Sequence, residues 1–190
     1  MEHVSRVNSI SIILGSGMSI LPHPSYSEAA RIRDEARDPR IVTLLEYYLT
    51  IHPRKTIPCR TDFDPFQVPT VMPNLTLTDV ERQPYRFKYR VMGTSVSYNM
   101  EFEGTGKYLD ELVPGVETQY PHLDRIRVAE EGIPVHRLGQ SSISFRSDFA
   151  DLERVHLPLA SDGQSVDMIL SIFIYFADST PMPQSLSSGS

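Results

Sequence analysis

Two aspartates, Asp62 and Asp64, stand two residues apart in the segment RTDFDPFQVP and are the first residues whose spacing could do chemistry. In an extended segment their side chains point to the same side, so the pair could act as acid and base or hold a metal ion. Oxygen-ligated metals need several more ligands, which the neighbouring residues do not offer. Asp64, directly before Pro65, also suits a turn in which its carboxylate accepts backbone N–H groups. We therefore interpret both aspartates as turn residues.

Other reactive residue types lack the spacing that their chemistry requires. The histidines form no H-x-x-x-H or H-E-x-x-H pattern, so zinc hydrolysis is not supported. Cys59 is the single cysteine, which excludes an internal disulfide and a cysteine-based zinc cluster. The GTGK segment that ends at Lys107 lacks the spacing of a nucleotide-binding P-loop. We expect no metal site and no enzymatic activity.

Composition places the chain among ordinary globular proteins. Its 190 residues are 40% hydrophobic and 22% charged, and they fit one domain with additional terminal segments. A net charge of -6 argues against nucleic acid and anionic membrane surfaces as partners. The apolar stretch VNSISIILGSGMSIL is interrupted by polar residues and is too short to span a membrane. It is either a signal or an ordered arm; we favour an arm with a strand at 10–14, and a cytoplasmic location.

Helix signals come early in the chain. Ser25 and Glu28 have the spacing of a capping box ahead of a polar helix. A second helix is predicted from Asp38, a capping residue, and Pro39, which suits the first helical position, to His52. Its apolar residues recur every three or four positions and must be buried; they are Ile41, Leu44, Leu45, Tyr48 and Leu49.

Strand signals dominate the rest of the chain. Segments 75–81 and 85–93 alternate in polarity around a short linker, which predicts a hairpin. Broken helical signals follow, and then a helix over 120–134 with Leu123, Ile126 and Ala129 on one side. Three strands are predicted within 134–177, the last of which is apolar enough to be central and covered on both faces. This order predicts an α+β fold, in which a five-stranded antiparallel sheet carries helices on one face and follows N-terminal helices.

The order of elements resembles that of a PAS domain, and five phrases resemble one bacterial PAS-type family, formerly catalogued as a domain of unknown function. The phrases are DFDPFQVP, MPNLTLTDV, RFKYRVMGTSV, TGKYLDEL and LPLASDGQSVDMIL. Two positions depart from the family pattern: Tyr48 stands where the family often has tryptophan, and Glu101 where it often has glycine. The chain then divides into an N-terminal arm (1–24), N-terminal helices (25–52), a PAS-like domain (53–177) and a disordered tail (178–190).

The resemblance implies a sensory or interaction module that dimerises and holds a small ligand between the sheet and its helices. It also draws attention to His122, because haem-binding PAS domains take an axial ligand from the long helix that faces the sheet; the cofactor, if any, stays unknown. Plain core packing is as good an account of the pocket candidates as ligand contact. These candidates are Tyr85, Phe87, Tyr89, Arg90, Val91, His122, Met168, Leu170, Ile172 and Ile174.

Three functions remain open at this point. The first is a cytoplasmic PAS-type module that binds a small apolar ligand or a protein partner and signals through another protein, as a homodimer. The second is an enzyme that pairs Asp62 or Asp64 with Tyr89 or His156. The third is a structural dimeric adaptor whose core holds no ligand.

Overall fold

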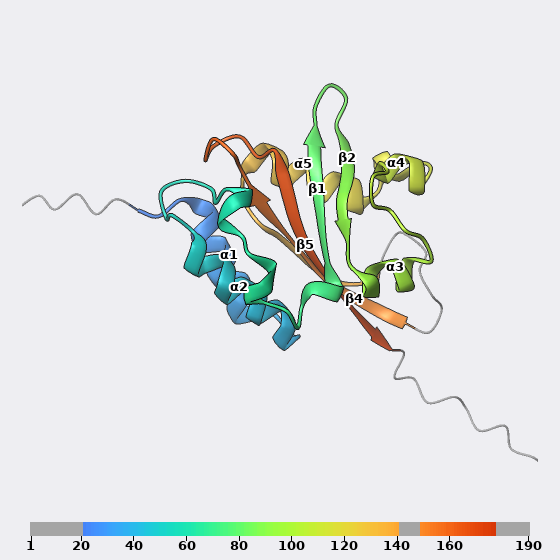
Figure 1. Ribbon diagram of the computed structural model, residues 1–190, viewed down its shortest axis with the longest axis horizontal. Helices are drawn as coiled ribbons and strands as arrows, with labels where there is room; N and C mark the ends of the chain where they lie inside the picture. Colours follow the sequence, from blue (N-terminus) through green and yellow to red (C-terminus); the bar gives the residue numbers. More distant parts are fainter. Residues whose placement is uncertain (1–20, 141–148, 178–190) are drawn as a thin grey trace, which may run out of the picture.

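The computed structural model describes residues 21–140 and 149–177, which form an α+β fold (Figure 1). Its antiparallel sheet has the strand order β2-β1-β5-β4-β3. This arrangement confirms the predicted sheet, including the central place of the last strand. The strands are β1 (Leu75–Glu81), β2 (Arg86–Met92), β3 (Val135–Gly139), β4 (Phe149–Leu159) and β5 (Met168–Ala177).

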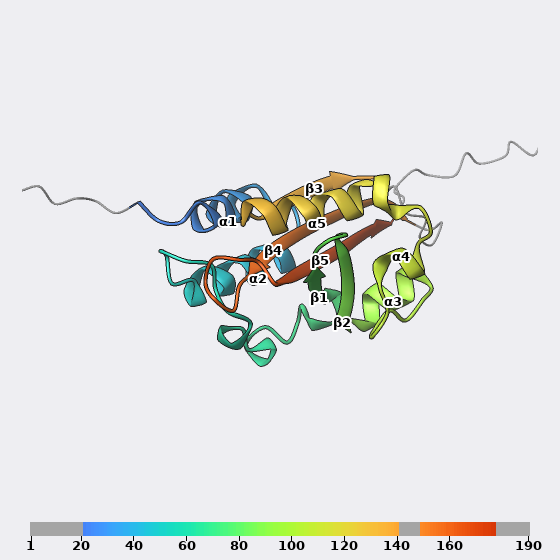
Figure 2. The same ribbon diagram turned by 90° about the horizontal axis from the view of Figure 1, so that it is seen from above.

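Helices cover both faces of this sheet. In Figure 1 the first two helices lie to one side of the strands, and the last helix runs behind them. Figure 2 shows from above that this last helix runs alongside β3 and β4. The helices are α1 (Pro24–Glu35), α2 (Pro39–Ile51), α3 (Thr94–Met100), α4 (Leu109–Leu112) and α5 (Tyr120–Glu131). Three single 3-10 turns, Arg60–Asp62, Pro65–Gln67 and Met72–Asn74, carry the chain from α2 to β1.

The sequence predicts the start of α2 correctly, but not the cap of α1. Asp38 caps α2 by accepting the N–H of Arg40 at 2.8 Å, with Pro39 at the first helical position. The predicted capping box of α1 is wrong, because the helix begins at Pro24 and its cap is His23. Ser25 is instead buried, and its hydroxyl bonds His23 and His52.

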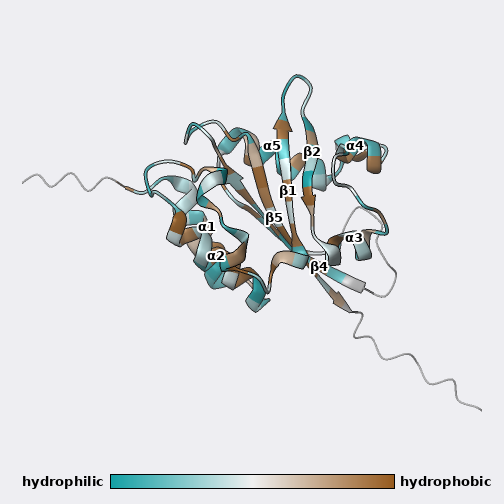
Figure 3. Ribbon diagram, viewed as in Figure 1, coloured by the Kyte–Doolittle hydropathy of each residue, from teal (hydrophilic) through white to brown (hydrophobic). Residues whose placement is uncertain are grey.

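The sheet has one hydrophobic core on each of its two faces. The first core joins the apolar stripe of α2 to alternate residues of the strands, and Tyr48 also donates its hydroxyl to the carbonyl of Pro158 at 2.9 Å. The second core lies under α3, α4 and α5. Figure 3 shows β5 mostly in the colour of apolar residues, as expected for a strand with cover on both faces. Sheet-facing residues of the first core include Leu75, Leu77, Val155, Leu157, Leu170, Ile172 and Ile174.

A bulge in the β1–β2 pair corrects one expectation about strand faces. The register shifts between Leu77, which pairs with Val91, and Thr78, which pairs with Tyr89. Arg90 is the extra residue, so the alternation of β2 changes phase there. Met92 therefore joins Phe87 and Tyr89 in the second core, while the side chain of Val91 is 50% exposed.

The inward side of α5 also differs from the prediction. Leu123 is 44% exposed, whereas Asp124 and Arg125 are buried together with Val128 and Ala129. The helix thus turns two charged residues toward the sheet. Apolar periodicity alone could not show this, because it assigns charged residues to the solvent.

The outer edge of β2 is covered by the segment that follows α3. The N–H of Tyr89 donates to the carbonyl of Lys107 at 2.9 Å, and the N–H of Gly106 donates to the carbonyl of Tyr89 at 2.7 Å. Lys88 and Tyr108 form a further antiparallel bridge. The predicted strand at 10–14 and the predicted tail at 178–190 lie outside the described residues.

Candidate functional site

A small cavity lies between the sheet and α5, on the side of the second core. It offers about 30 Å³ of internal room, enough for roughly two water molecules. Side chains from β2, α3, α5, β4 and β5 converge on it because the twisted sheet and α5 face each other there. They are Tyr89, Met92, Val96, Met100, Pro121, Arg125, Leu152, Arg154, His156, Phe173 and Tyr175.

Arg125 enters this cavity from the first half of α5. Its side chain is 1% exposed. One terminal nitrogen donates to the carbonyl of Pro121 at 2.5 Å, and the other reaches the Tyr89 hydroxyl at 3.5 Å. Its Nε is buried and has no hydrogen-bond partner in the described part of the chain. No carboxylate among the described residues forms an ion pair with this guanidinium.

Arg154 also lines the cavity, from the middle of β4. It is 3% exposed, and its buried Nε and Nη1 have no hydrogen-bond partner among residues 21–140 and 149–177. Burial lowers the pKa of Arg154, and the nearby guanidinium groups of Arg137 and Arg125 act in the same direction. A guanidinium nevertheless stays protonated in proteins, so Arg154 is a buried positive charge.

His156 lies two residues further along β4 and on the same face. Its Nδ1 is 2.7 Å from the hydroxyl of Ser171, and its buried Nε2 has no partner in the described structure. Burial, followed by the charges of Arg125 and Arg154, holds the pKa of His156 well below its usual value. The imidazole is therefore neutral at neutral pH.

The charges around the cavity do not balance. Asp124, 2% exposed, is the carboxylate that acts on Arg154. Both of its oxygens already accept from Arg137, and the Oδ1 contact with Nη2 is 2.6 Å long. Three guanidinium groups thus face one carboxylate among the described residues. Isolated charges are costly to bury, so this excess of two positive charges is the most unusual feature of the second core.

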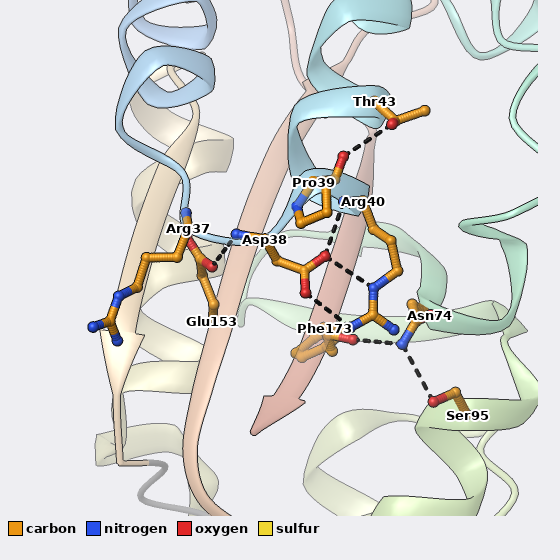
Figure 4. Close-up of polar contacts among 9 residues, drawn as sticks. All are labelled: Arg37, Asp38, Pro39, Arg40, Thr43, Asn74, Ser95, Glu153 and Phe173. Carbon is orange, nitrogen blue, oxygen red and sulfur yellow. Dashed lines mark hydrogen bonds and ion pairs between the residues drawn. The ribbon is translucent and has the colours of Figure 1, made fainter. Parts of the chain in front are cut away.

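On its other face, β4 holds the N-terminal helices. Glu153, which directly precedes Arg154 in the sequence, is fully buried. Its carboxylate accepts the backbone N–H of Arg37 at 3.0 Å and that of Asp38 at 3.1 Å, at the junction of α1 and α2 (Figure 4). His136 of β3 lies 2.9 Å from the same carboxylate. One strand therefore carries the cavity residues and the anchor of α1 and α2 on alternate positions.

Asn74 ties the start of β1 to the cavity wall. Its amide donates to the carbonyl of Phe173 at 2.9 Å and to the hydroxyl of Ser95 at 3.2 Å, as Figure 4 shows. Phe173 lines the cavity, and Ser95 belongs to α3, the helix that closes it. The asparagine of the MPNLTLTDV segment thus fixes α3 relative to the sheet.

The ten pocket candidates are not brought together. Of them, Tyr89 alone lines the cavity; Tyr85 and Phe87 lie in the same core, where the Phe87 ring meets the His122 ring edge-on at 5.1 Å. Burial lowers the pKa of His122. His122 is 4% exposed, but it does not line the cavity.

The remaining candidates lie elsewhere. Arg90 is exposed and pairs with Asp79 at 2.5 Å. The expectation that Arg90 reaches into the pocket is therefore wrong. Four candidates from β5 belong to the first core or pack against it: Met168, Leu170, Ile172 and Ile174. Val91 and Leu170 also line an apolar hollow of about 240 Å³ against Phe63 and Met72, on the face opposite the cavity. The expectation of one pocket lined by all ten is corrected, because β5 alternates between two cores.

Sequence reasoning missed Arg125 and Arg154, and it named His156 only as a base. The signal was present in DLERVHLPLA, where charged residues interrupt a strand that is otherwise buried. A strand covered on both faces has no solvent side for an arginine. Because side chains alternate along a strand, the sequence places Arg154 and His156 on one face of β4 and Glu153 on the other.

Asp62 and Asp64 act as turn residues, as interpreted. Asp62 accepts the N–H of Cys59 at 2.8 Å, and Asp64 accepts the N–H of Phe66 at 3.0 Å. Their segment packs on the first core through Phe63, whereas Tyr89 and His156 lie across the sheet. The structure does not bring these aspartates to Tyr89 or His156. Within the described ranges, no three histidine, cysteine or acidic side chains converge as metal ligands.

Comparisons with family models and with curated proteins give no evidence about function, which is therefore argued from the geometry of the site. No family model matches the chain, and a search of the curated proteins finds no significant match. None of the described helices is both long and apolar enough to cross a membrane.

Proposed function

We propose that this chain is a PAS-type sensory module, whose cavity beneath α5 holds a small ligand and whose N-terminal helices report on its occupancy. The proposal includes a cytoplasmic location, a homodimer, and a signalling protein as the receiver. No residue of the chain is assigned a catalytic role. The proposal rests on the resemblance of the element order to PAS domains and on the site described above.

The observation that carries the proposal is the set of unpartnered polar atoms around the cavity. Arg125, Arg154 and His156 are at most 3% exposed, and each has a buried nitrogen without a partner in the described chain. Buried donors are nearly always satisfied in native proteins, because leaving one unpaired costs about 1–3 kcal/mol. Three such groups around one cavity point to an occupant that completes their hydrogen bonds.

β4 offers a direct route from the cavity to the N-terminal helices. A ligand that draws Arg154 into the cavity acts on the backbone of Glu153, whose carboxylate holds the N–H groups of Arg37 and Asp38. Packed interfaces respond to small shifts by changing between discrete arrangements. The position or the stability of α1 and α2 would then depend on occupancy, and a partner that binds them would detect the change.

Native mass spectrometry of the protein purified from its own host tests ligand binding. We expect the wild-type chain to retain a small molecule, Arg154→Gln to lose it, and Arg127→Gln to keep it. Arg127 is the matched control because it lies on the exposed side of α5 and pairs with Glu131. A wild-type mass equal to that of the bare chain would favour the structural adaptor instead.

Amide hydrogen exchange tests the route through β4. Removing the retained molecule should speed exchange at Arg37 and Asp38, whose N–H groups Glu153 holds. Exchange at Val113, whose N–H donates to the carbonyl of Leu109 in α4, serves as the internal reference. Equal exchange of Arg37 and Asp38 with and without the molecule would contradict the signalling role.

A further inference from the structure

The cavity has one cationic wall and one apolar wall. Arg125 and Arg154 form the cationic wall, and His156 adds one neutral ring nitrogen. The apolar wall includes Met92 of β2 and Val96 and Met100 of α3. An occupant has to satisfy both walls, so it needs an anionic end and an apolar end.

The cationic wall favours a carboxylate. A guanidinium presents its N–H groups in a planar fork that matches the two oxygens of a carboxylate. The free Nε of Arg125 and the free Nε and Nη1 of Arg154 are the donors available for it. One carboxylate would accept these hydrogen bonds and offset part of the excess positive charge beside Asp124.

The apolar wall limits the size of the rest of the molecule. With about 30 Å³ of room, the cavity accepts a short carboxylate only if its apolar side chains shift slightly. Methionine side chains are flexible and adapt to small apolar groups. Met92 and Met100 can therefore admit a methyl or ethyl group, whereas a ring system is too large for a cavity of about 30 Å³.

We infer that the cavity binds a short-chain carboxylate, with its oxygens on Arg125 and Arg154 and its methyl or ethyl end against Met92, Val96 and Met100. This inference rests on the proposed ligand-binding function and names the class of its ligand. It replaces the small apolar ligand expected from the sequence, because Tyr89 is the single one of the ten candidates that lines this cavity.

Thermal unfolding with added acetate or propionate, at constant ionic strength, tests this inference. A ligand that binds the folded state raises Tm in a concentration-dependent manner. We expect acetate and propionate to raise Tm, and we expect acetamide, which has the same shape without the charge, to leave it unchanged. Equal shifts with acetate and acetamide, or no shift with either acid, would overturn the inference.

Three arginine variants locate the site. Arg125→Gln and Arg154→Gln should each weaken acetate binding at least about tenfold, the usual effect of losing a hydrogen bond to a charged group. Arg127→Gln, on the exposed side of the same helix, should bind acetate as the wild type does. Similar losses in all three variants would indicate a general effect of charge and overturn the assignment.

A measurement on the wild type alone covers the case in which a variant fails to fold. Arginine Nε–H signals in a nitrogen-correlated NMR spectrum report directly on new hydrogen bonds. Acetate should shift the signals of Arg125 and Arg154 and leave those of Arg31 and Arg127, which are exposed and paired with glutamates, in place. Phosphate that shifts these two signals where acetate does not would overturn the carboxylate class.

The outcomes separate this inference from the proposed function. If a molecule other than a carboxylate is retained from the host and is lost in Arg154→Gln, the sensory module stands and the ligand class is wrong. If acetate binds at Arg125 and Arg154 while exchange at Arg37 and Asp38 stays the same, the site stands and the signalling role fails.

Discussion

Adjacent residues of β4 show two opposite ways of burying a charge. The carboxylate of Glu153 accepts two backbone N–H groups and lies against His136, so its charge is stabilised by donors within the fold. The guanidinium of Arg154 has unpartnered donors although it is equally buried. The first residue therefore contributes to stability, whereas the second is costly until a ligand binds.

This contrast predicts that Arg154→Met stabilises the ligand-free protein. Replacing an uncompensated buried charge with an apolar side chain of similar length removes its desolvation cost. We expect a gain of about 1–2 kcal/mol in the free energy of unfolding, measured by urea denaturation of dialysed protein. Arg127→Met, at an exposed position, should change it by less than about 0.5 kcal/mol. A loss of stability in Arg154→Met would show that the guanidinium already has a partner.

Among single residues, the sequence predicted those whose environment is local. The turn roles of Asp62 and Asp64 and the cap at Asp38 depend on neighbours within three positions. Arg125 and Arg154 could not be recognised in this way, because their role depends on a cavity that is lined by residues from five elements. The bulge at Arg90, which turns Val91 away from the second core, also left no clear mark in the sequence.

At the scale of elements, a chain of hydrogen bonds joins the start of α1 to the end of α2. The N–H of Arg54 donates to Nδ1 of His52 at 3.0 Å, which leaves His52 Nε2–H to donate to the Ser25 hydroxyl at 2.8 Å. The Ser25 hydroxyl in turn donates to His23 at 2.7 Å. This chain requires a neutral His52, since a protonated ring could not accept from Arg54.

Acidification should therefore weaken the packing of the two helices. Burial, followed by the charge of His23, lowers the pKa of His52 to about 4. Because the unfolded chain takes up this proton near the ordinary pKa of about 6.5, stability is full above that pH and is lost as the pH falls toward 4. We expect His52 to account for about 1–2 kcal/mol of that loss.

Urea denaturation at about pH 7 and about pH 5 measures this effect. His52→Gln should be less stable than the wild type at the higher pH and should lose less stability on acidification. His156 adds a loss of the same sign in both proteins, because its pKa is also lowered. Identical pH dependence in the two proteins would contradict the role of His52.

The end of α3 carries a strained residue. Glu101 adopts a left-handed conformation with φ 60° and ψ 24°, at the position where the resembled family often has glycine. Glycine adopts this conformation without the steric cost that a Cβ atom brings. Glu101→Gly should therefore raise the free energy of unfolding by about 0.5–1 kcal/mol in urea denaturation. Glu130→Gly, inside α5, should lower it by about 1 kcal/mol, and a loss in both variants would contradict the prediction.

For the whole molecule, the two cores make the N-terminal helices part of the fold. Ala29, Ile32 and the apolar stripe of α2 pack on the face of the sheet that lies opposite α5. The sequence predicted the antiparallel sheet, the central place of its last strand and the helix positions because the hydrophobic periods of α2, β1 and β5 are regular. It did not predict that α1 and α2 cover the second face of the sheet, since contacts between distant segments leave no periodic signal.

A chain that begins at residue 53 should consequently aggregate. Without α1 and α2 it would expose Leu75, Leu157 and Ile172, together with their neighbours in the first core. Apolar patches of that extent drive association. We expect aggregation in size-exclusion chromatography and strong binding of a hydrophobic dye. Cooperative unfolding of a soluble monomer would show that residues 53–177 are stable alone.

The backbone cover on β2 has a consequence for self-association. Unpaired strand borders are templates on which another polypeptide can add, a step toward fibrils. Gly106 and Lys107 already occupy the hydrogen-bonding groups of Tyr89 on that border. Growth of the sheet from one copy into the next is therefore blocked at this end, and any pairing of two protomers must use other surfaces.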